Sequence, residues 1–305
     1  MKKTLPLILK VLLGLLFIVS AILKMMDMDR FEVYVYSFQW FSLNQSFLVA
    51  RVAIIIEFIL GIGLISNCFH RLMWWGGMAM LSAYTLFLVY TLTIGRNDSC
   101  HCFGAFLPFN PWQSILKNLV LMGLFALVYK VKGCSFKGQW LALIGVAIAS
   151  TLAVFIVSPP DNYIHNSSPE QNLNETLFNE ILSQPPLDAL QLQDGKQVVC
   201  FFTTSCELCQ LAAHKLSIMQ QRYGFPSENI TFVFMGNEEG IKEFYEQSES
   251  AEYRSVLYED VHGLLKVING NFPTMAFLDH GTVVHEYGLR NMNEEEIKLF
   301  FTKKD

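Results

Sequence analysis

The sequence predicts an all-α, multi-pass bundle of membrane helices followed by an α/β domain with a mixed central sheet and helices on both faces. Charged residues make up only 16% of the 305 residues, whereas soluble domains average about 25%. The charges are also uneven: residues 1–158 carry 12 basic and 5 acidic side chains, and residues 159–305 carry 10 basic and 22 acidic ones. The acidic second half excludes a basic nucleic-acid-binding protein, and long apolar runs with 25 Phe exclude a disordered chain.

Five apolar stretches in the first half are long enough to cross a bilayer, which takes about 20 residues. They are Leu5–Lys24, Phe47–Ser66, Leu72–Ile94, Trp112–Lys130 and Gln139–Ser158. Short cytoplasmic loops of membrane proteins are rich in Lys and Arg. Seven of these residues lie at the N-terminus and in the second and fourth loops, against Arg30 and Arg96 in the opposite loops. We therefore expect a multi-pass membrane protein with its N-terminus inside and the chain after Ser158 on the outer face.

The spans leave two questions open. The first span has an alternative interpretation as a signal peptide cleaved after Val19-Ser20-Ala21, which would not change the other orientations. Glu57, near the middle of the second span, is costly in a membrane unless it is paired or protonated. It is either a proton or ligand site or, the favoured interpretation, an interhelix partner for a base such as Lys24, Arg96 or Lys117.

Three segments follow from this pattern: a membrane domain over 1–158, a tether over 159–190 and a soluble domain over 191–305. Pro159-Pro160 ends the fifth span, because proline lacks the donor that continues a helix. Within the tether, Ser168-Pro169-Glu170-Gln171 starts a helix that runs to about Gln184, where Pro185-Pro186 breaks it.

Short strands alternate with helices in the soluble domain. The expected strands are Gln197–Phe202, Ile230–Met235, Thr274–Asp279 and Thr282–Tyr287, the last two joined by a hairpin turn. The expected helices are Cys206–Tyr223, Glu238–Gln247, Val261–Ile268 and Asn293–Lys304. Strand–helix–strand followed by a hairpin and a helix gives a mixed sheet covered on both faces.

The predicted topology sorts the seven cysteines by compartment. Cys68 and Cys134 fall in inside loops, where thiols stay reduced. Cys200 lies within a strand and is expected to be a small buried hydrophobic residue. The other four form two close pairs, Cys100-His101-Cys102 and Cys206-Glu207-Leu208-Cys209, and both pairs fall on the outer, oxidising face. These four residues are the candidate catalytic residues.

The pair Cys206 and Cys209 follows a strand and opens a helix. Free backbone N–H groups and the helix dipole at this place stabilise a thiolate on Cys206, and Cys209 lies one turn further along. Glu207 opposes the dipole, because a neighbouring carboxylate raises a thiol pKa. The alternatives are a structural disulfide and half of a zinc site.

Downstream, Phe272-Pro273-Thr274 opens the strand before the hairpin. With the strand–CxxC–helix start and the strand order, about 110 residues of the tail resemble a thioredoxin-fold domain. The resemblance implies that Cys206 is the nucleophile and Cys209 the resolving thiol. It also implies that Pro273 is a cis proline on the substrate side, with the backbone of Phe272 free to pair with a bound peptide.

Two residues depart from that family's pattern. Ser205 stands where a tryptophan often precedes the first cysteine, and Cys200 stands where typical thioredoxins have a buried acid. Without this acid, the proton of Cys209 must leave to water or to another group.

Cys100 and Cys102 lie in the outside loop Asp98-Ser99-Cys100-His101-Cys102-Phe103-Gly104 between the third and fourth spans. A disulfide across one residue closes a strained ring, and strained disulfides exchange readily. The alternatives are static bridges and metal binding by Cys100, His101 and Cys102.

The Cys-x-Cys-Phe-Gly loop, with Gly14–Lys24 and Glu57–Leu64, resembles membrane proteins of the methylamine-utilisation MauE type within the DoxX-like group, over about residues 5–155. This likeness implies a role in the maturation of disulfide-rich periplasmic proteins. It also implies that the chain lies in the bacterial cytoplasmic (inner) membrane, with its C-terminal domain on the periplasmic, outer face.

Together these features predict a membrane-anchored thiol–disulfide oxidoreductase that exchanges disulfides with cysteine-containing extracytoplasmic client proteins. The tail dithiol would relay to the loop pair, and the tether makes that step effectively intramolecular. Because no cysteine lies within a span, oxidation or isomerisation of clients is favoured over reduction. A membrane quinone is the hypothetical electron acceptor, and no other cofactor is expected. The alternatives are an assembly module with a non-catalytic tail and a metallochaperone.

Overall fold

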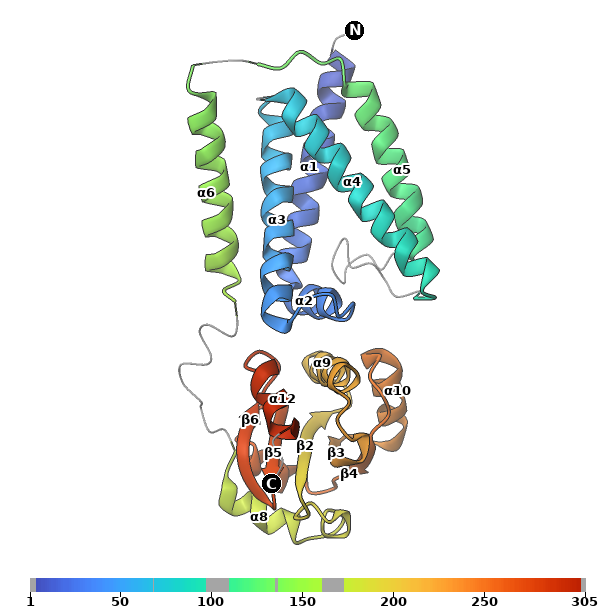
Figure 1. The fold of residues 1–305 in the computed structure, drawn as a ribbon, viewed down its shortest axis with the longest axis vertical. Helices are drawn as coiled ribbons and strands as arrows, with labels where there is room; N and C mark the ends of the chain where they lie inside the picture. Colours follow the sequence, from blue (N-terminus) through green and yellow to red (C-terminus); the bar gives the residue numbers. More distant parts are fainter. Residues whose placement is uncertain (1–3, 68, 97–109, 135–136, 161–172, 303–305) are drawn as a thin grey trace. The chain divides into compact units, whose positions relative to one another are not determined.

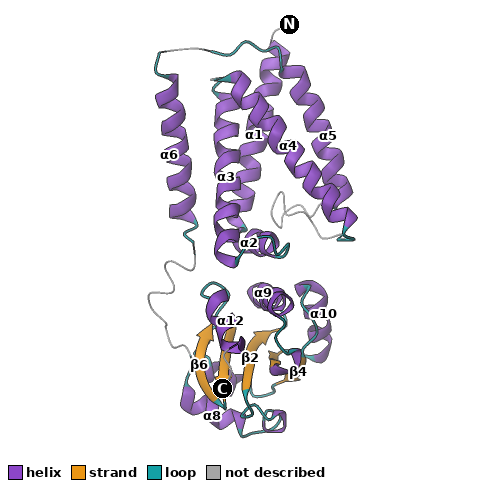
Figure 2. Ribbon diagram, viewed as in Figure 1, coloured by secondary structure: helices purple, strands orange, loops and turns teal. Residues whose placement is uncertain are grey.

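The structure, a computed structural model, describes residues 4–67, 69–96, 110–134, 137–160 and 173–302 (Figure 1). The chain divides into two compact units. The membrane unit consists of Met1–Tyr34 with Phe47–Pro159, and the soluble unit consists of Val35–Ser46 with Pro160–Asp305. All the strands lie in the soluble unit (Figure 2).

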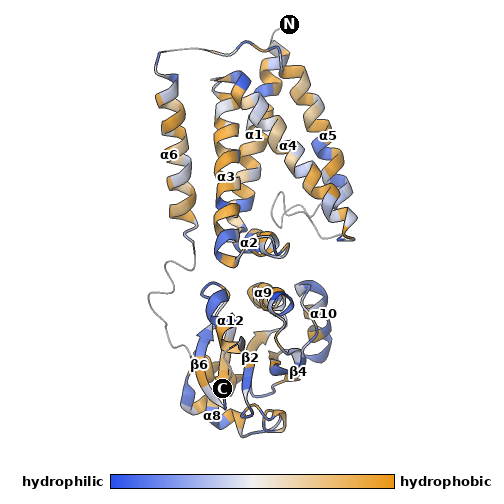
Figure 3. Cartoon of the chain, in the orientation of Figure 1, coloured by the Kyte–Doolittle hydropathy of each residue, from blue (hydrophilic) through white to orange (hydrophobic). Residues whose placement is uncertain are grey.

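Five long helices in the described residues confirm the five predicted spans. They are α1 (Thr4–Met26), α3 (Leu43–Ile65), α4 (His70–Thr93), α5 (Pro111–Val128) and α6 (Gln139–Val157). Each is long and apolar enough to cross a membrane, and Figure 3 shows the apolar residues that cover them. The chain is therefore a multi-pass membrane protein.

Two glycines let α1 and α3 approach closely. A Cβ atom on Gly14 would lie 2.8 Å from the carbonyl oxygen of Gly61, and a Cβ atom on Gly61 would lie 2.8 Å from the carbonyl oxygen of Gly14. Small residues at a membrane helix crossing allow such backbone contact, which strengthens van der Waals packing.

Glu57 of α3 is paired inside the bundle. The Nζ atom of Lys24 lies 2.7 and 2.9 Å from its two carboxylate oxygens, and both side chains are 2% exposed. Lys24 also donates to Ser20 Oγ at 2.7 Å, and the hydroxyl of Tyr84 donates to Glu57 Oε1 at 2.9 Å. The structure therefore shows the interhelix pair that the sequence favoured, with Lys24 as the base.

A short helix, α2 (Met28–Tyr36), was not predicted. It is only nine residues long and mixes charged with apolar residues, so a search for apolar spans misses it. Its Glu32 forms a buried ion pair with Arg51 of α3. Arg51 Nε donates to the Ser158 carbonyl at 2.9 Å and its Nη2 donates to the Pro159 carbonyl at 2.8 Å. Arg51 thereby satisfies carbonyl groups where α6 ends, since such groups have no partner within the helix.

The soluble unit contains a five-stranded mixed sheet with the order β4-β3-β2-β5-β6. The strands are β2 (Lys196–Thr203), β3 (Ile230–Met235), β4 (Arg254–Leu257), β5 (Thr274–Asp279) and β6 (Thr282–Tyr287). β2, β3 and β4 run parallel, and β5 is antiparallel to both β2 and β6. The predicted mixed sheet is confirmed. β4 was missed because it is a four-residue edge strand with no apolar alternation.

Helices cover both faces of this sheet, as predicted. They are α8 (Glu175–Leu182), α9 (Glu207–Tyr223), α10 (Glu238–Ser248), α11 (Val261–Val267) and α12 (Glu294–Thr302), with short turns η2 (Asp188–Leu190) and η3 (Ser227–Asn229). Side chains alternate along β2: Phe201 joins a core cluster with α8 and α11, whereas Phe202 stacks on Phe244 of α10, with ring centroids 5.6 Å apart. On that second face, Phe277 meets Phe300 of α12 at 5.4 Å.

The helix expected within the tether corresponds to α8, which ends at Leu182, close to the expected Gln184, and belongs to the core of the soluble unit. Its predicted start, Ser168-Pro169-Glu170-Gln171, lies outside the described residues. Asn174 caps α8 by accepting a hydrogen bond from the Leu177 amide, and Phe178, Ile181 and Leu182 are buried in the same cluster as Phe201. The amphipathic pattern of this helix buries its apolar face against the sheet.

Candidate active site

Cys206 lies in the junction between β2, which ends at Thr203, and α9, which begins at Glu207. The turn that follows β2 is fixed by a hydrogen bond from the Thr204 amide to the Met235 carbonyl at 3.1 Å and by one from the Cys206 amide to the Thr203 carbonyl at 3.3 Å. Cys206 has extended backbone angles and is the N-cap residue of α9. This is the strand-to-helix position that the sequence predicted.

The Cys206 sulfur collects hydrogen bonds from the start of α9. It accepts from the Cys209 amide at 3.2 Å. The Cys209 thiol contributes most, and with the amides of Cys209 and Leu208 it lowers the pKa of Cys206 from 9.0 to about 6, although burial and the Glu207 carboxylate act in the opposite direction. The expected influence of Glu207 is therefore present. A thiolate is the attacking species in disulfide exchange, so Cys206 is equipped as a nucleophile near neutral pH.

Cys209, in contrast, is a buried thiol that stays protonated. Its side chain is buried, and burial, followed by the hydrogen bond to Cys206, raises its thiol pKa well above the usual range. Both thiols are free in the structure. The pair therefore consists of one partly exposed thiolate and one buried, protonated thiol that donates to it.

Cys200 occupies the expected position in the middle of β2. It is fully buried, and burial raises its thiol pKa. It pairs with Phe232 of β3 on one side and with Met275 of β5 on the other. A neutral thiol thus stands where a thioredoxin has a carboxylate, so this position supplies no base for Cys209.

Pro273 lies at the same edge of the sheet as the dithiol. The Phe272–Pro273 peptide bond is cis, as the thioredoxin resemblance implied. Thr274, the first residue of β5, is opposite Phe201 in the antiparallel pairing with β2. Pro273 therefore precedes β5 at the end of β2 that leads to Cys206, while its role toward a bound peptide remains a prediction.

The loop pair Cys100 and Cys102 lies outside the described residues, so its exchange with Cys206 and Cys209 stays a prediction. Of the two cysteines predicted inside, Cys134 is exposed and free, and Cys68 lies outside the described residues. Where residues are described, no group of three or more His, Cys, Asp and Glu side chains is arranged to hold a metal ion.

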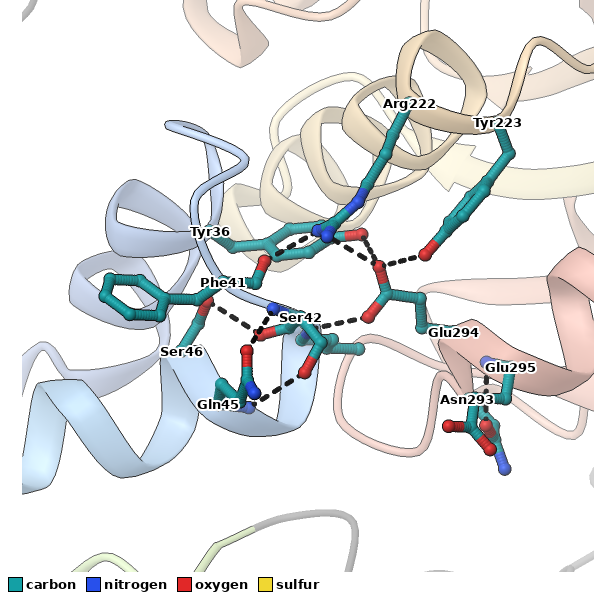
Figure 4. Close-up of polar contacts among 11 residues, drawn as sticks. Tyr36, Phe41, Ser42, Gln45, Ser46, Arg222, Tyr223, Asn293, Glu294 and Glu295 are labelled. Carbon is teal, nitrogen blue, oxygen red and sulfur yellow. Dashed lines mark hydrogen bonds and ion pairs between the residues drawn. The ribbon is translucent and has the colours of Figure 1, made fainter.

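A buried carboxylate at the other end of α9 was not anticipated from the sequence (Figure 4). Glu294 Oε1 accepts from the hydroxyls of Tyr36 at 2.9 Å and Tyr223 at 2.8 Å, and lies 3.3 Å from Arg222 Nη1. Its Oε2 accepts from the Leu43 amide at 2.6 Å. We call these five residues the Glu294 cluster.

The Glu294 cluster binds the chain segment 35–46 to α9 and α12 within the soluble unit. Arg222 Nη1 also donates to the Phe41 carbonyl at 2.6 Å. Burial and then the hydrogen bond to Glu294 raise the pKa of Tyr223 to about 12, so the phenol stays a donor at neutral pH. No sequence signal pointed to this cluster, because Glu294 lies in an acidic run, Glu294-Glu295-Glu296, that is typical of a solvated first helical turn.

The membrane unit contains a cavity of about 100 Å³ among α1, α3, α4 and α5, which is a further candidate site. Its walls are mostly apolar side chains such as Phe17 and Phe125, and its polar groups include Lys24, Tyr84 and Asn118. Apolar walls with a few convergent polar groups are typical of small-molecule sites.

Comparisons with known proteins agree with this division of the chain. Residues 2–131 match the family model of methylamine utilisation protein MauE. The N-terminal part of the chain is a MauE-type domain. Protein TlpB of Flavobacterium psychrophilum is 25% identical over 333 aligned residues, which cover 88% of this chain and 89% of that protein. The resemblance of the membrane part to MauE, inferred above from its loop and spans, is thus confirmed.

Two solved structures match the region after the MauE-type domain. One is a thiol:disulfide interchange protein from Bacteroides sp., with 19% identity and a TM-score of 0.30, covering 37% of this chain and 78% of that chain. The other is a secreted disulfide oxidoreductase of Mycobacterium tuberculosis, with 16% identity and a TM-score of 0.29, covering 38% of this chain and 84% of that chain.

Proposed function

We propose that this membrane thiol–disulfide oxidoreductase oxidises cysteine-containing client proteins on the periplasmic face of the bacterial inner membrane and relays their electrons to its own loop pair. The observation that carries the proposal is the asymmetric dithiol at the start of α9. Its Cys206 thiolate is stabilised, with a pKa of about 6. Stabilising the thiolate favours the reduced form, and a dithiol whose reduced form is favoured makes a stronger oxidant as a disulfide.

The client reaction begins with the Cys206–Cys209 disulfide. A client thiolate attacks the Cys206 sulfur, the bond between the two enzyme sulfurs breaks, and Cys209 takes the electron pair and then a proton. A second client thiolate attacks the client sulfur of the mixed disulfide, and Cys206 leaves with the electron pair. Because the Cys206 thiolate is stable at neutral pH, it is the better leaving group. The client gains a disulfide and the enzyme dithiol gains two electrons.

Reoxidation would use Cys100 and Cys102. The Cys206 thiolate attacks their disulfide, one loop thiol leaves, and Cys209 then attacks Cys206 after losing its proton. This restores the Cys206–Cys209 disulfide and leaves two thiols in the loop. Cys200 stands at the position of the acid that would take up this proton. The proton of Cys209 must therefore leave to water or to another group, and we expect this step to be slow.

A membrane quinone is the acceptor that we propose for the loop pair. Such a group takes up two electrons and two protons and so supplies the final oxidation. The apolar walls of the cavity beside Lys24 suit a part of its ring. Lys24 and Tyr84 already donate to Glu57, and Asn118 donates to Thr85. A quinone oxygen would therefore have to take over one of these hydrogen bonds. Tyr84 lies nine residues before the end of α4 and Asn118 seven residues after the start of α5. At about 1.5 Å per residue, both lie roughly two turns from the helix ends that border the Cys100–Cys102 loop.

Trapping tests the relay in the full chain. In the Cys209→Ala variant, Cys206 cannot be released by its partner, so mixed disulfides with clients should accumulate in cells quenched with acid. Some of them should join Cys206 to Cys100 or Cys102, as read by mass spectrometry of the digested chain. The Cys206→Ala variant is the matched control and should give no adduct through this helix.

Two outcomes would overturn the proposal. The first is the absence of any Cys206 adduct, which is expected of an assembly module with a non-catalytic tail. The second is a chain that purifies with bound metal and loses it in the double Cys→Ser variants, which is expected of a metallochaperone. The sidedness is tested by a membrane-impermeant maleimide on intact spheroplasts. It should label Cys206 but not Cys134, which we predict on the inner face, and the reverse result would contradict the periplasmic placement.

A further inference from the structure

We propose that the membrane unit binds the phosphate headgroup of an anionic phospholipid in a basic cavity where α5 ends and α4 and α6 begin. This site is independent of the dithiol chemistry. The cavity has a volume of about 890 Å³. Arg71, Lys130 and Lys132 line it, and no carboxylate is present among its described lining residues. Three cations without an anion create a site that is complementary to a phosphate group.

Hydrogen bonds between two loops hold this cavity in shape. The Cys134 amide donates to the Asn67 carbonyl at 3.0 Å, and the Asn67 side-chain amide donates to the Lys132 carbonyl at 3.0 Å. His70 Nε2 lies 3.1 Å from the Tyr129 carbonyl oxygen. The backbone that carries the cations is therefore positioned before any ligand binds, which reduces the entropy lost on binding.

Aromatic side chains place the cavity at the level of lipid headgroups. The rings of Phe69 and Trp140 pack with centroids 4.4 Å apart, while Tyr129 and Trp140 are 50% and 61% exposed. Exposed Trp and Tyr at the ends of membrane spans mark the interface between hydrocarbon and water. Cationic pockets between membrane helices at this level suit anionic lipid headgroups.

The least buried of the spans provides a path for the acyl chains. Only 11% of the apolar window of α6 is buried, against 28–50% for the other four spans. Its exposed apolar residues begin at Trp140, which lines the cavity, and continue with Leu141 and Ile144. A lipid would thus place its phosphate on the cations and its chains along α6. A free phosphate ion would use only the first of these features.

The test is a titration of the purified full chain in neutral detergent with phosphatidylglycerol, phosphatidylcholine or inorganic phosphate. Native mass spectrometry counts the retained lipid, and the melting temperature reports the effect of binding. We expect one tightly retained phosphatidylglycerol and a higher melting temperature with it than with phosphatidylcholine. Each of Arg71→Gln, Lys130→Gln and Lys132→Gln should weaken phosphatidylglycerol binding about fivefold, since a cation near an anionic lipid contributes roughly that factor.

Lys137→Gln is the matched control, because Lys137 lies in the same loop region but does not line the cavity. It should leave binding within about twofold. Each substitution is made singly, so the test does not depend on the folding of a chain that lacks all three cations. Equal retention of both lipids, or equal losses in Lys137→Gln and Lys132→Gln, would overturn the site. An equal stabilisation by inorganic phosphate alone would overturn the lipid as its ligand.

Discussion

Replacing Cys209 by alanine removes the thiol that donates to Cys206, the largest of the contributions that lower the Cys206 pKa. Two backbone amides, those of Leu208 and of residue 209 itself, still donate to the sulfur in the Cys209→Ala variant. We therefore expect the Cys206 pKa to rise from about 6 toward 9.0, the value from which it is lowered, without reaching it. The resolving cysteine would thus also set the reactivity of its partner.

The size of the expected change in reactivity follows from the fraction of Cys206 that is thiolate. With a pKa of about 6, roughly nine-tenths of Cys206 is thiolate at pH 7, whereas an ordinary thiol is only a few per cent ionised. Any rise in the pKa of Cys206 lowers the thiolate fraction at pH 7. Alkylation of Cys206 by iodoacetamide, followed at a series of pH values by mass spectrometry, gives the inflection directly.

Two matched variants sharpen this measurement. Cys209→Ser retains a hydroxyl donor and should keep part of the low inflection. Cys200→Ala removes a buried thiol of the same domain that makes no contribution to the Cys206 pKa, and the inflection should stay near 6. An inflection near 9 in the unmodified chain, or one that does not move in Cys209→Ala, would refute the reasoning.

The lowered pKa also makes the stability of the reduced soluble unit depend on pH. The Cys206 pKa is lower in the folded chain, about 6, than its ordinary value of 9.0. Its contribution to stability is therefore fully present above about pH 9 and is lost as the pH falls through about 6. Urea unfolding of the reduced chain should show a midpoint that rises between these values, and the oxidised chain, which has no such thiolate, should lack this component.

Three further substitutions test the charges described above. Glu207→Gln should lower the pKa of the nucleophilic thiol further, because Glu207 raises it, and the alkylation profile reports this. Glu294→Gln removes the buried charge and replaces one of the two carboxylate oxygens by an NH2 group, so at least one of the four donors around Glu294 loses its acceptor. The free energy of unfolding, measured in urea, should fall by about 3 kcal/mol, whereas the exposed neighbour Glu295→Gln should change it by less than about 0.5 kcal/mol. Glu57→Gln should destabilise the bundle by roughly 3 kcal/mol through the unpaired Lys24, and exchanging both residues for apolar ones should restore much of the loss in a thermal melt.

The local pattern of the sequence predicts most of the elements that the structure contains. The strands Ile230–Met235, Thr274–Asp279 and Thr282–Tyr287 have the predicted bounds, because a run of buried β-branched and aromatic residues between turn residues is a local signal. The dithiol at a strand–helix junction is predictable for the same reason. α2 and β4 are not, since one is short and amphipathic and the other is an exposed edge strand.

Contacts between distant parts of the chain could not be predicted from local patterns. Glu294 and Tyr36 are 258 residues apart in the sequence, and nothing in the acidic run around Glu294 distinguishes the buried carboxylate from its exposed neighbour. Likewise, the Cys206–Cys209 spacing predicts a lowered pKa, but only the geometry shows that the Cys209 thiol contributes more than the backbone amides.

The assignment of segment 35–46 to the soluble unit links its folding to biogenesis at the membrane. A truncated chain that begins at Pro160 lacks the Tyr36 hydroxyl, the Leu43 amide and the Phe41 carbonyl that complete the Glu294 cluster. Its buried carboxylate would keep only donors from α9. The soluble unit can therefore complete this cluster only when the connection between the first two spans lies on the same side of the membrane, and a separately produced domain that starts at Pro160 would lack it.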